Sequence, residues 1–348
     1  MEELNEAPPQ SGPNPSQNTS VVLRQIRGPL EVVHGAVPEP GPRQVRIRVE
    51  AAGVSQADIT IRNGMYPTGA PLPFTLGYDA VGRIDKLGAE VKHLREGQRV
   101  AAIVVRGAYT RYLCWDADDV TPVPEGVEPG PAVCLLLNYM TAYQMLHRVA
   151  KVQRGQKVLV TSAAGGVGTA LLQLGRLQEL EMYGTASSGK LELVRSLGAT
   201  PIDYTREDFA KRVRELAPGG VDVALDAIGG DNFTRAYSTL KRGGHFVGYG
   251  FTSKMSSPLW GRIDTFARFG WMMMKPDGRK AAFHGIMFMK KAHPDWFRED
   301  LTALLELHRQ GKLAPVVAGT LPLTEASRAL ELLDSGKVTG KLVLDCTR

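Results

Sequence analysis

The sequence predicts an α/β protein in which a doubly wound parallel sheet follows a smaller β-rich unit. First, a β-branched run at residues 158–161 leads into a glycine-rich turn at 163–168 and then into an apolar helical pattern. Second, apolar runs and helical patterns keep alternating as far as Gly250, which is typical of a parallel sheet. Third, the region before residue 140 contains short strand-like runs, such as residues 44–49, between closely spaced Gly and Pro residues.

Length and composition favour a globular chain of two domains. The chain has 348 residues, and residues 1–20, rich in Pro, Asn, Gln and Ser, are predicted to form a disordered leader. The acidic N-terminus lacks an apolar run, so we expect no secretory signal. No apolar run approaches the roughly 18 residues of a membrane span. Three widely spaced cysteines suit a reducing compartment, so we expect a cytoplasmic protein.

The glycine-rich turn points to a bound dinucleotide. A strand, a glycine turn and a helix present the N–H groups of a helix N-terminus to a pyrophosphate. Ala163 stands where the first glycine of the G-x-G-x-x-G motif is expected, so the prediction depends on the surrounding strands and helices. A tight βα connection without a ligand is the alternative.

The next strand, residues 182–187, predicts NADPH rather than NADH as the cofactor. NAD-preferring sites place a carboxylate at the end of this strand, on the adenosine ribose. Here the strand runs into Ser187, Ser188, Gly189 and Lys190. Two hydroxyls and an ammonium can bind a phosphate, which a carboxylate would repel.

The net charge of +6 is concentrated in one segment. Residues 252–291 carry eight bases and two acids. A solvated surface explains this, and so does a local field that attracts anionic substrates or lipid headgroups. No groove-reading motif accompanies the bases, so we expect no nucleic-acid partner.

Several segments resemble the medium-chain dehydrogenase/reductase superfamily. They are residues 50–58 (EAAGVSQAD), 62–67 (RNGMYP), 77–82 (GYDAVG) and 97–100 (GQRV), in this order ahead of AAGGVG. Within that superfamily the chain resembles the zinc-free quinone oxidoreductases, and most of all the branch of the vesicle amine transport protein homologues. LNYMTAY at 137–143, GTAS at 184–187, PIDY at 201–204 and DAIGG at 226–230 carry this second match.

The resemblance implies a domain arrangement. A GroES-like catalytic domain would comprise residues 21–140 and be completed by residues 286–348, with a Rossmann NADP-binding domain at 141–285. It also implies a homodimer.

The resemblance further implies chemistry without zinc. Zinc members of the superfamily place their catalytic ligands at positions that here hold Ser55, Tyr78 with Asp79, and Leu137, which do not make a credible zinc site. Without a Lewis acid, a quinone or an α,β-unsaturated carbonyl is the expected hydride acceptor, because its carbon is already electrophilic.

Site residues follow from the same resemblance. Tyr66 is the expected proton donor, with packing against the nicotinamide as the alternative. Ser55, Asn138 and Trp260 are expected to line the substrate pocket. The expected cofactor contacts are Thr141, Ala163, Gly165, Gly166, Val167, Gly184, Ser187, Ser188, Lys190, Tyr204, Tyr249, Gly250 and Thr252. No metal ligand is expected.

Two other functions remain open. An enoyl-thioester reductase would suit the positive segment, which could attract a phosphopantetheine or CoA phosphate, so the substrate is either a small apolar molecule or a thioester. A non-catalytic adaptor in peripheral contact with a membrane would suit the methionine-rich, basic residues 258–274.

Overall fold

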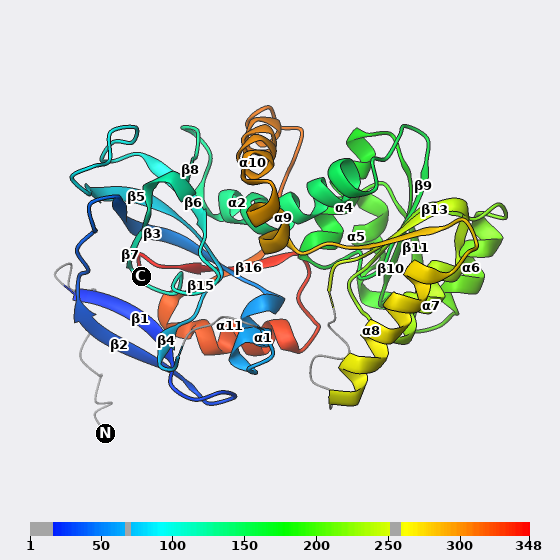
Figure 1. The fold of residues 1–348 in the computed structure, drawn as a ribbon, viewed down its shortest axis with the longest axis horizontal. Coiled ribbons are helices and arrows are strands. Elements are labelled where there is room, and N and C mark those ends of the chain that lie inside the picture. Colours follow the sequence, from blue (N-terminus) through cyan, green and yellow to red (C-terminus); the bar gives the residue numbers. More distant parts are fainter. Residues whose placement is uncertain (1–16, 67–70, 251–258) are drawn as a thin grey trace, which may run out of the picture.

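The computed structural model describes the chain except residues 1–16, 67–70 and 251–258, and for residues 259–262 it describes the backbone alone. Two lobes lie side by side, a β-rich lobe and a nucleotide-type lobe, joined by a central helical segment (Figure 1). The C-terminal strand returns to the β-rich lobe (Figure 1). None of the helices in these ranges combines the length and the apolar character required to cross a bilayer.

The second lobe contains a six-stranded parallel sheet. Its strands are β9 (Lys157–Val160), β10 (Glu181–Ala186), β11 (Thr200–Asp203), β12 (Val221–Asp226), β13 (Leu240–Gly248) and β14 (Lys280–Phe283). They lie in the order β11-β10-β9-β12-β13-β14, and every neighbouring pair is parallel. From β9, the strands β10 and β11 are added on one side and β12, β13 and β14 on the other. A doubly wound sheet binds its ligand at this switch point, between β9 and β12. The predicted fold class is confirmed.

Helices cover both faces of this sheet. They are α4 (Gly166–Leu177), α5 (Leu191–Ser196), α6 (Phe209–Leu216), α7 (Asp231–Ser238) and α8 (Leu259–Met274). Val158, Val160 and Val247 face one hydrophobic core, which continues into the first lobe, whereas Leu159 and Phe246 face a second core. Alternate side chains of a strand point to opposite faces, so each strand is buried on both sides.

The first lobe is built around a seven-stranded sheet. Its order is β15-β16-β3-β5-β6-β8, with β7 also paired to β3. The strands are β3 (Gln44–Val54), β5 (Asp79–Leu87), β6 (Arg99–Ile103), β7 (Tyr112–Asp116), β8 (Thr121–Pro122), β15 (Val317–Pro322) and β16 (Lys341–Asp345). Because β16 pairs antiparallel with β3, the last strand completes the sheet of the first lobe.

A small second sheet, in the order β2-β1-β4, corrects the predicted leader. It contains β1 (Gln17–Leu23), β2 (Leu30–Ala36) and β4 (Phe74–Thr75). Residues 17–20, assigned to the leader from their polar composition, belong to β1. Their hydroxyls are used, since Ser20 Oγ lies 2.6 Å from Thr110 Oγ1 and Thr19 Oγ1 lies 3.1 Å from His34 Nδ1.

The remaining helices connect the lobes or pack beside them. They are α1 (Gln56–Arg62), α2 (Pro129–Cys134), α3 (Met140–Tyr143), α9 (Ile286–Ala292), α10 (Pro294–Arg309) and α11 (Ala326–Asp334), with 3₁₀ turns at Ala117–Asp119, Ser188–Lys190 and Leu323–Glu325. Two π-helical turns, Leu135–Tyr139 and Gln144–Val149, flank α3. Such turns are rare and occur often at functional sites.

Candidate functional site

The glycine-rich turn between β9 and α4 has the geometry of an anion site. Ser162 takes a left-handed conformation with φ of 54°, and α4 begins after Gly165 without a side-chain cap. A Cβ on Gly168 would lie 2.3 Å from the Ser162 carbonyl oxygen, so only glycine allows this tight a turn. The first-turn N–H groups, Val167 among them, therefore form an uncapped helix N-terminus that can bind a pyrophosphate.

The departure of Ala163 from the motif is accommodated by the next strand. Ala163 is fully buried, and its N–H donates to the Thr185 carbonyl at 2.9 Å. A Cβ on Gly184 would lie 2.8 Å from the Ala163 Cβ. The methyl group of Ala163 thus uses space that the glycine on β10 leaves open. A residue with a side chain at position 184 of β10 would collide with this methyl group.

Asn138 and Thr141 come from the central helical segment. Asn138 lies in the first π-helical turn and Thr141 in α3, and both are nearly buried. A Cβ on Gly166 would lie 2.0 Å from Asn138 Nδ2, so the Asn138 amide touches the start of α4. The structure therefore brings Asn138, predicted as a pocket residue, into contact with the nucleotide turn.

The adenosine edge holds the predicted phosphate-binding residues and one acid that sequence reasoning missed. Ser188 Oγ donates a hydrogen bond to Asp203, at the end of β11, and this bond holds the pKa of Asp203 below its usual value. Asp203 pairs in register with Ala186, so a carboxylate lies beside the end of β10 after all. The signal in the sequence was the acid of PIDY, which ends β11 and not β10.

The other residues at this edge of the sheet differ in their exposure and in how many of their polar groups already have hydrogen-bond partners. Lys190 Nζ donates to the carbonyls of Gly336 at 2.8 Å and Val338 at 2.7 Å, which leaves one of its three N–H donors. Burial lowers the pKa of Lys190. Ser187 is half-buried and the Tyr204 side chain is 55% exposed, so both remain accessible.

The loop after β13 carries two more of the expected contacts. Tyr249 N–H donates to the Asp226 carbonyl at 3.0 Å, and a Cβ on Gly250 would lie 2.8 Å from the Ala227 carbonyl oxygen. Gly250 therefore allows a close approach of two loops at the carboxyl edge of the sheet. Thr252 and the Trp260 side chain lie outside the described residues.

On the first lobe, Tyr66 forms a pair with Tyr78. Their hydroxyl oxygens are 2.9 Å apart, and the rings meet edge to face at 86° with centroids 5.9 Å apart. Tyr66 is half-buried, whereas Tyr78 is 2% exposed, and burial raises the pKa of Tyr78 far above its usual value. Tyr78 therefore stays a neutral phenol that can donate to Tyr66.

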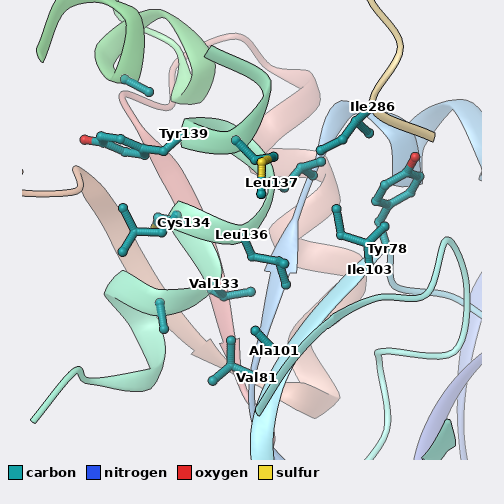
Figure 2. Packing of buried hydrophobic residues seen from close by; sticks show 14 of the residues in the cluster. Tyr78, Val81, Ala101, Ile103, Val133, Cys134, Leu136, Leu137, Tyr139 and Ile286 are labelled. Atoms are coloured by element: carbon teal, nitrogen blue, oxygen red, sulfur yellow. The ribbon is translucent and has the colours of Figure 1, made fainter. Parts of the chain in front are cut away.

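Leu137 stands at another position where zinc members carry a ligand, and it packs in the same apolar cluster as Tyr78. Tyr78, Ile103, Leu137 and Ile286 belong to one buried cluster at the junction of the lobes (Figure 2). Leu137 provides only an alkyl side chain there. No group of three or more His, Cys, Asp or Glu side chains suited to a metal ion occurs among the residues that the structure describes.

Ser55, which is expected from the sequence to line the substrate pocket, is engaged in helix capping. It is the N-cap of α1, and its hydroxyl donates to Asp58 Oδ2 at 2.6 Å. The Ser55 N–H donates to the same oxygen at 2.8 Å. Asp58 is fully buried, and burial raises its pKa to about 7. The spacing of Ser55 and Asp58 is that of a capping box, so the motif was readable from the sequence.

A buried ion pair in the sheet of the first lobe, between β5 and β16, was not predicted from the sequence. Lys341 Nζ lies 2.9 Å from Asp79 Oδ2, and both side chains are at most 1% exposed. A Cβ on Gly53 would lie 2.3 Å from Lys341 Cε and 2.5 Å from Asp79 Oδ2, so this glycine makes room for the pair. The signal in the sequence was a lysine at the start of the apolar run KLVLD.

The residues fit a dinucleotide lying across the carboxyl edge of the sheet. The uncapped N-terminus of α4 can hold the pyrophosphate, and Gly168 and Gly250 mark places where a side chain would block the backbone approach. Ser187 follows β10 and Tyr204 follows β11 at this same edge. Tyr66 belongs to the other lobe, where it contacts Tyr78.

Comparison with known proteins agrees with this geometry. The family model described as "Alcohol dehydrogenase GroES-like domain" matches residues 41–125, and the one described as "Zinc-binding dehydrogenase" matches residues 197–344. The rat "Synaptic vesicle membrane protein VAT-1 homolog" is 31% identical over 317 residues, which cover 88% of this chain and 78% of that protein.

Two solved structures show the same fold over nearly the whole chain. A Pseudomonas syringae quinone oxidoreductase superposes with a TM-score of 0.83 at 27% identity, covering 94% of this chain and 99% of that one. A mycobacterial protein complexed with NADPH superposes with a TM-score of 0.82 at 28% identity, with the same coverage. The chain therefore belongs to the medium-chain dehydrogenase/reductase superfamily of oxidoreductases, in the group that contains the VAT-1 homologues and the quinone oxidoreductases.

Proposed function

We propose that the protein is an NADPH-dependent oxidoreductase that transfers hydride, without zinc, to a quinone or an α,β-unsaturated carbonyl. The observation that carries this proposal is that one lobe has an uncapped glycine turn and the other lobe has the Tyr66–Tyr78 pair. A nicotinamide cofactor, when bound, supplies the hydride. The chain itself needs to orient the acceptor and supply a proton.

Tyr66 is the proposed proton donor. As the acceptor takes up hydride at carbon, negative charge develops on its oxygen, and the Tyr66 hydroxyl can deliver a proton there. Tyr78 then donates a hydrogen bond to the Tyr66 oxygen, whose negative charge it stabilises. The fully buried Tyr78 cannot readily lose its own proton, so the direction of this hydrogen bond is maintained.

The acceptor class follows from the residues at the three ligand positions of zinc members. Ser55 is engaged with Asp58, Tyr78 with Tyr66, and Leu137 offers no donor atom. A plain alcohol would need strong stabilisation of its alkoxide. Quinones and enones need only a proton donor near an already polarised carbonyl.

The choice between the phosphorylated and the unphosphorylated cofactor rests on opposing observations. Ser187 and Lys190, together with the NADPH bound to the mycobacterial relative, support NADPH. The Asp203 carboxylate at the same edge favours NADH, but its oxygens already accept hydrogen bonds from Ser188 and Thr205. We therefore propose NADPH, to be tested by comparing the dissociation constants of the two cofactors.

The reaction is tested by NADPH oxidation with 1,2-naphthoquinone, an alkyl enone and an enoyl thioester. We expect turnover of at least the quinone or the enone, and Tyr66→Phe should lower kcat/KM about 100-fold with little change in NADPH affinity. Turnover of the thioester alone would identify an enoyl-thioester reductase. If cofactor binds and all three acceptors leave it unoxidised, the proposed activity is wrong.

Helix α8 supports a second candidate, a peripheral membrane contact. Ile263, Phe266, Met273 and Met274 recur at helical spacing and are all exposed. The basic charge nearby is partly neutralised, because Arg268 pairs with Asp264 at 2.9 Å. Flotation with phosphatidylserine vesicles, compared with a Met273→Glu, Met274→Glu variant, tests this candidate. Failure of the unmodified protein to float would eliminate it.

We also propose a homodimer. Among the residues that the structure describes, strand β14 pairs with β13 alone and ends the six-stranded sheet, so its outer backbone edge can accept a second strand. Light scattering should then give twice the 37.8 kDa chain mass. A monomer mass at micromolar concentration would contradict the proposal.

A further inference from the structure

His284 is a buried polar side chain without a visible partner. It is 1% exposed, and neither ring nitrogen has a hydrogen-bond partner among the residues that the structure describes. Burial lowers its pKa to about 4, so the ring is neutral at physiological pH. A neutral imidazole has one donor and one acceptor, and leaving both unpaired in a protein interior is unfavourable.

The position of His284 is that of a ligand-binding residue. It follows β14 directly, and its N–H donates to the Gly248 carbonyl at 2.8 Å, at the end of β13. His284 therefore lies at the carboxyl edge of the parallel sheet, where doubly wound sheets bind dinucleotides. The adenosine half belongs over β10 and β11, so the nicotinamide half belongs over β12, β13 and β14.

The strand pattern gives the face on which His284 lies. Ala282 pairs in register with Val247, whose side chain faces the core shared with the first lobe. If the alternation continues past β14, His284 is on the same face as Ala282. Two residues further on, Ile286 packs in the cluster that contains Tyr78 (Figure 2). His284 is thus assigned to the face of the sheet that meets the first lobe, two residues before Ile286.

We propose that His284 binds the nicotinamide half of the cofactor through a hydrogen bond to the carboxamide group. The proposal rests on the proposed function, because it requires a nicotinamide nucleotide at this edge. A carboxamide carries both N–H donors and a carbonyl acceptor, so either nitrogen of the neutral ring finds a complementary partner. Its binding orients the nicotinamide ring and satisfies a group that is otherwise buried unpaired.

The test separates the two ends of the cofactor. In His284→Leu, we expect the NADPH dissociation constant to rise about tenfold, as for the loss of one hydrogen bond, while the affinity for 2′-phospho-ADP-ribose, which lacks nicotinamide, stays unchanged. The melting temperature without ligand should be equal or higher, because an unpaired polar group has been removed. His284→Gln, which keeps a donor and an acceptor, should retain part of the affinity.

His245 provides a matched control. It lies on β13 in register with Lys280, at the opposite end of β14 from His284. His245→Leu should leave both affinities unchanged. The proposal is overturned if His284→Leu weakens both ligands equally, or weakens neither. If the unmodified protein binds 2′-phospho-ADP-ribose and NADPH with equal affinity, His284 makes no carboxamide contact. If it binds neither, the proposed cofactor itself is wrong.

Discussion

The two halves of the candidate site are built in different ways. The nucleotide turn is made of main chain, because adjacent residues from Ser162 to Gly168 create its shape and its donors. The first-lobe half is made of side chains from distant segments, such as Asp79 and Lys341, which are 262 positions apart. The turn should therefore be sensitive to added volume, and the first-lobe half to changes in charge.

The largest effect is expected from Lys341→Met, which removes charge from the first-lobe half. Asp79 would remain fully buried without its partner, with Asp58, a second buried carboxyl, nearby. Breaking such a pair from one side costs about 3–5 kcal/mol of unfolding free energy. Urea unfolding measures the loss.

A double variant separates charge from shape at this pair. Asp79→Asn combined with Lys341→Met removes both charges and should recover more than half of the loss. If the double variant is as unstable as Lys341→Met, packing around β16 and not the unpaired carboxylate explains the loss.

Gly168→Ala is the corresponding change in the turn. The new Cβ would lie 2.3 Å from the Ser162 carbonyl oxygen and 2.6 Å from the Ala163 backbone, so the turn must open. We expect NADPH affinity to fall about 100-fold and stability by about 2–3 kcal/mol. Calorimetric titration and thermal melting provide the two measurements. Gly219→Ala, where a Cβ meets nothing within 4 Å, should change neither.

This contrast explains what the sequence could predict. The parallel sheet and the turn were predictable because each rests on local spacing, such as a strand, a glycine turn and a helix in direct succession. The Asp79–Lys341 pair was not, because pairing depends on β16 lying beside β3. For the same reason the orientation of His284, after β14, could not be read from the chain.

Two predicted site residues show the same limit. Ser55 stands at a family position, yet its hydroxyl belongs to the cap of α1, where it donates to Asp58. Lys190 follows β10 as expected, yet its ammonium contacts Gly336 and Val338 carbonyls from the C-terminal segment. Spacing identified the residues, but only the tertiary structure identified their partners.

Asp58→Asn sharpens the comparison through pH. Because burial raises its pKa to about 7 against about 4 when unfolded, the folded protein binds a proton that the unfolded chain releases between these values. Wild-type stability therefore declines as pH rises from about 4 to about 7. Asparagine removes this decline, so relative to wild type the variant should gain about 2–3 kcal/mol between pH 5 and pH 8. Denaturant unfolding at both pH values measures the gain, and an equal difference at both would show that Asp58 stays ionised.

The smallest effect concerns a single charge at the edge of the nucleotide half. Asp203→Asn removes a carboxylate whose pKa is held low, first of all by the Ser188 hydrogen bond, and which is therefore ionised at neutral pH. Because a phosphate on the adenosine ribose would be repelled by that charge, NADPH affinity should rise about fivefold while NADH affinity stays the same or falls. Glu192→Gln, an exposed acid in the first turn of α5, is the control and should leave the ratio unchanged. An unchanged ratio in Asp203→Asn would mean that the phosphate is bound away from the β11 end of the sheet, which would also remove Ser188 from the cofactor contacts.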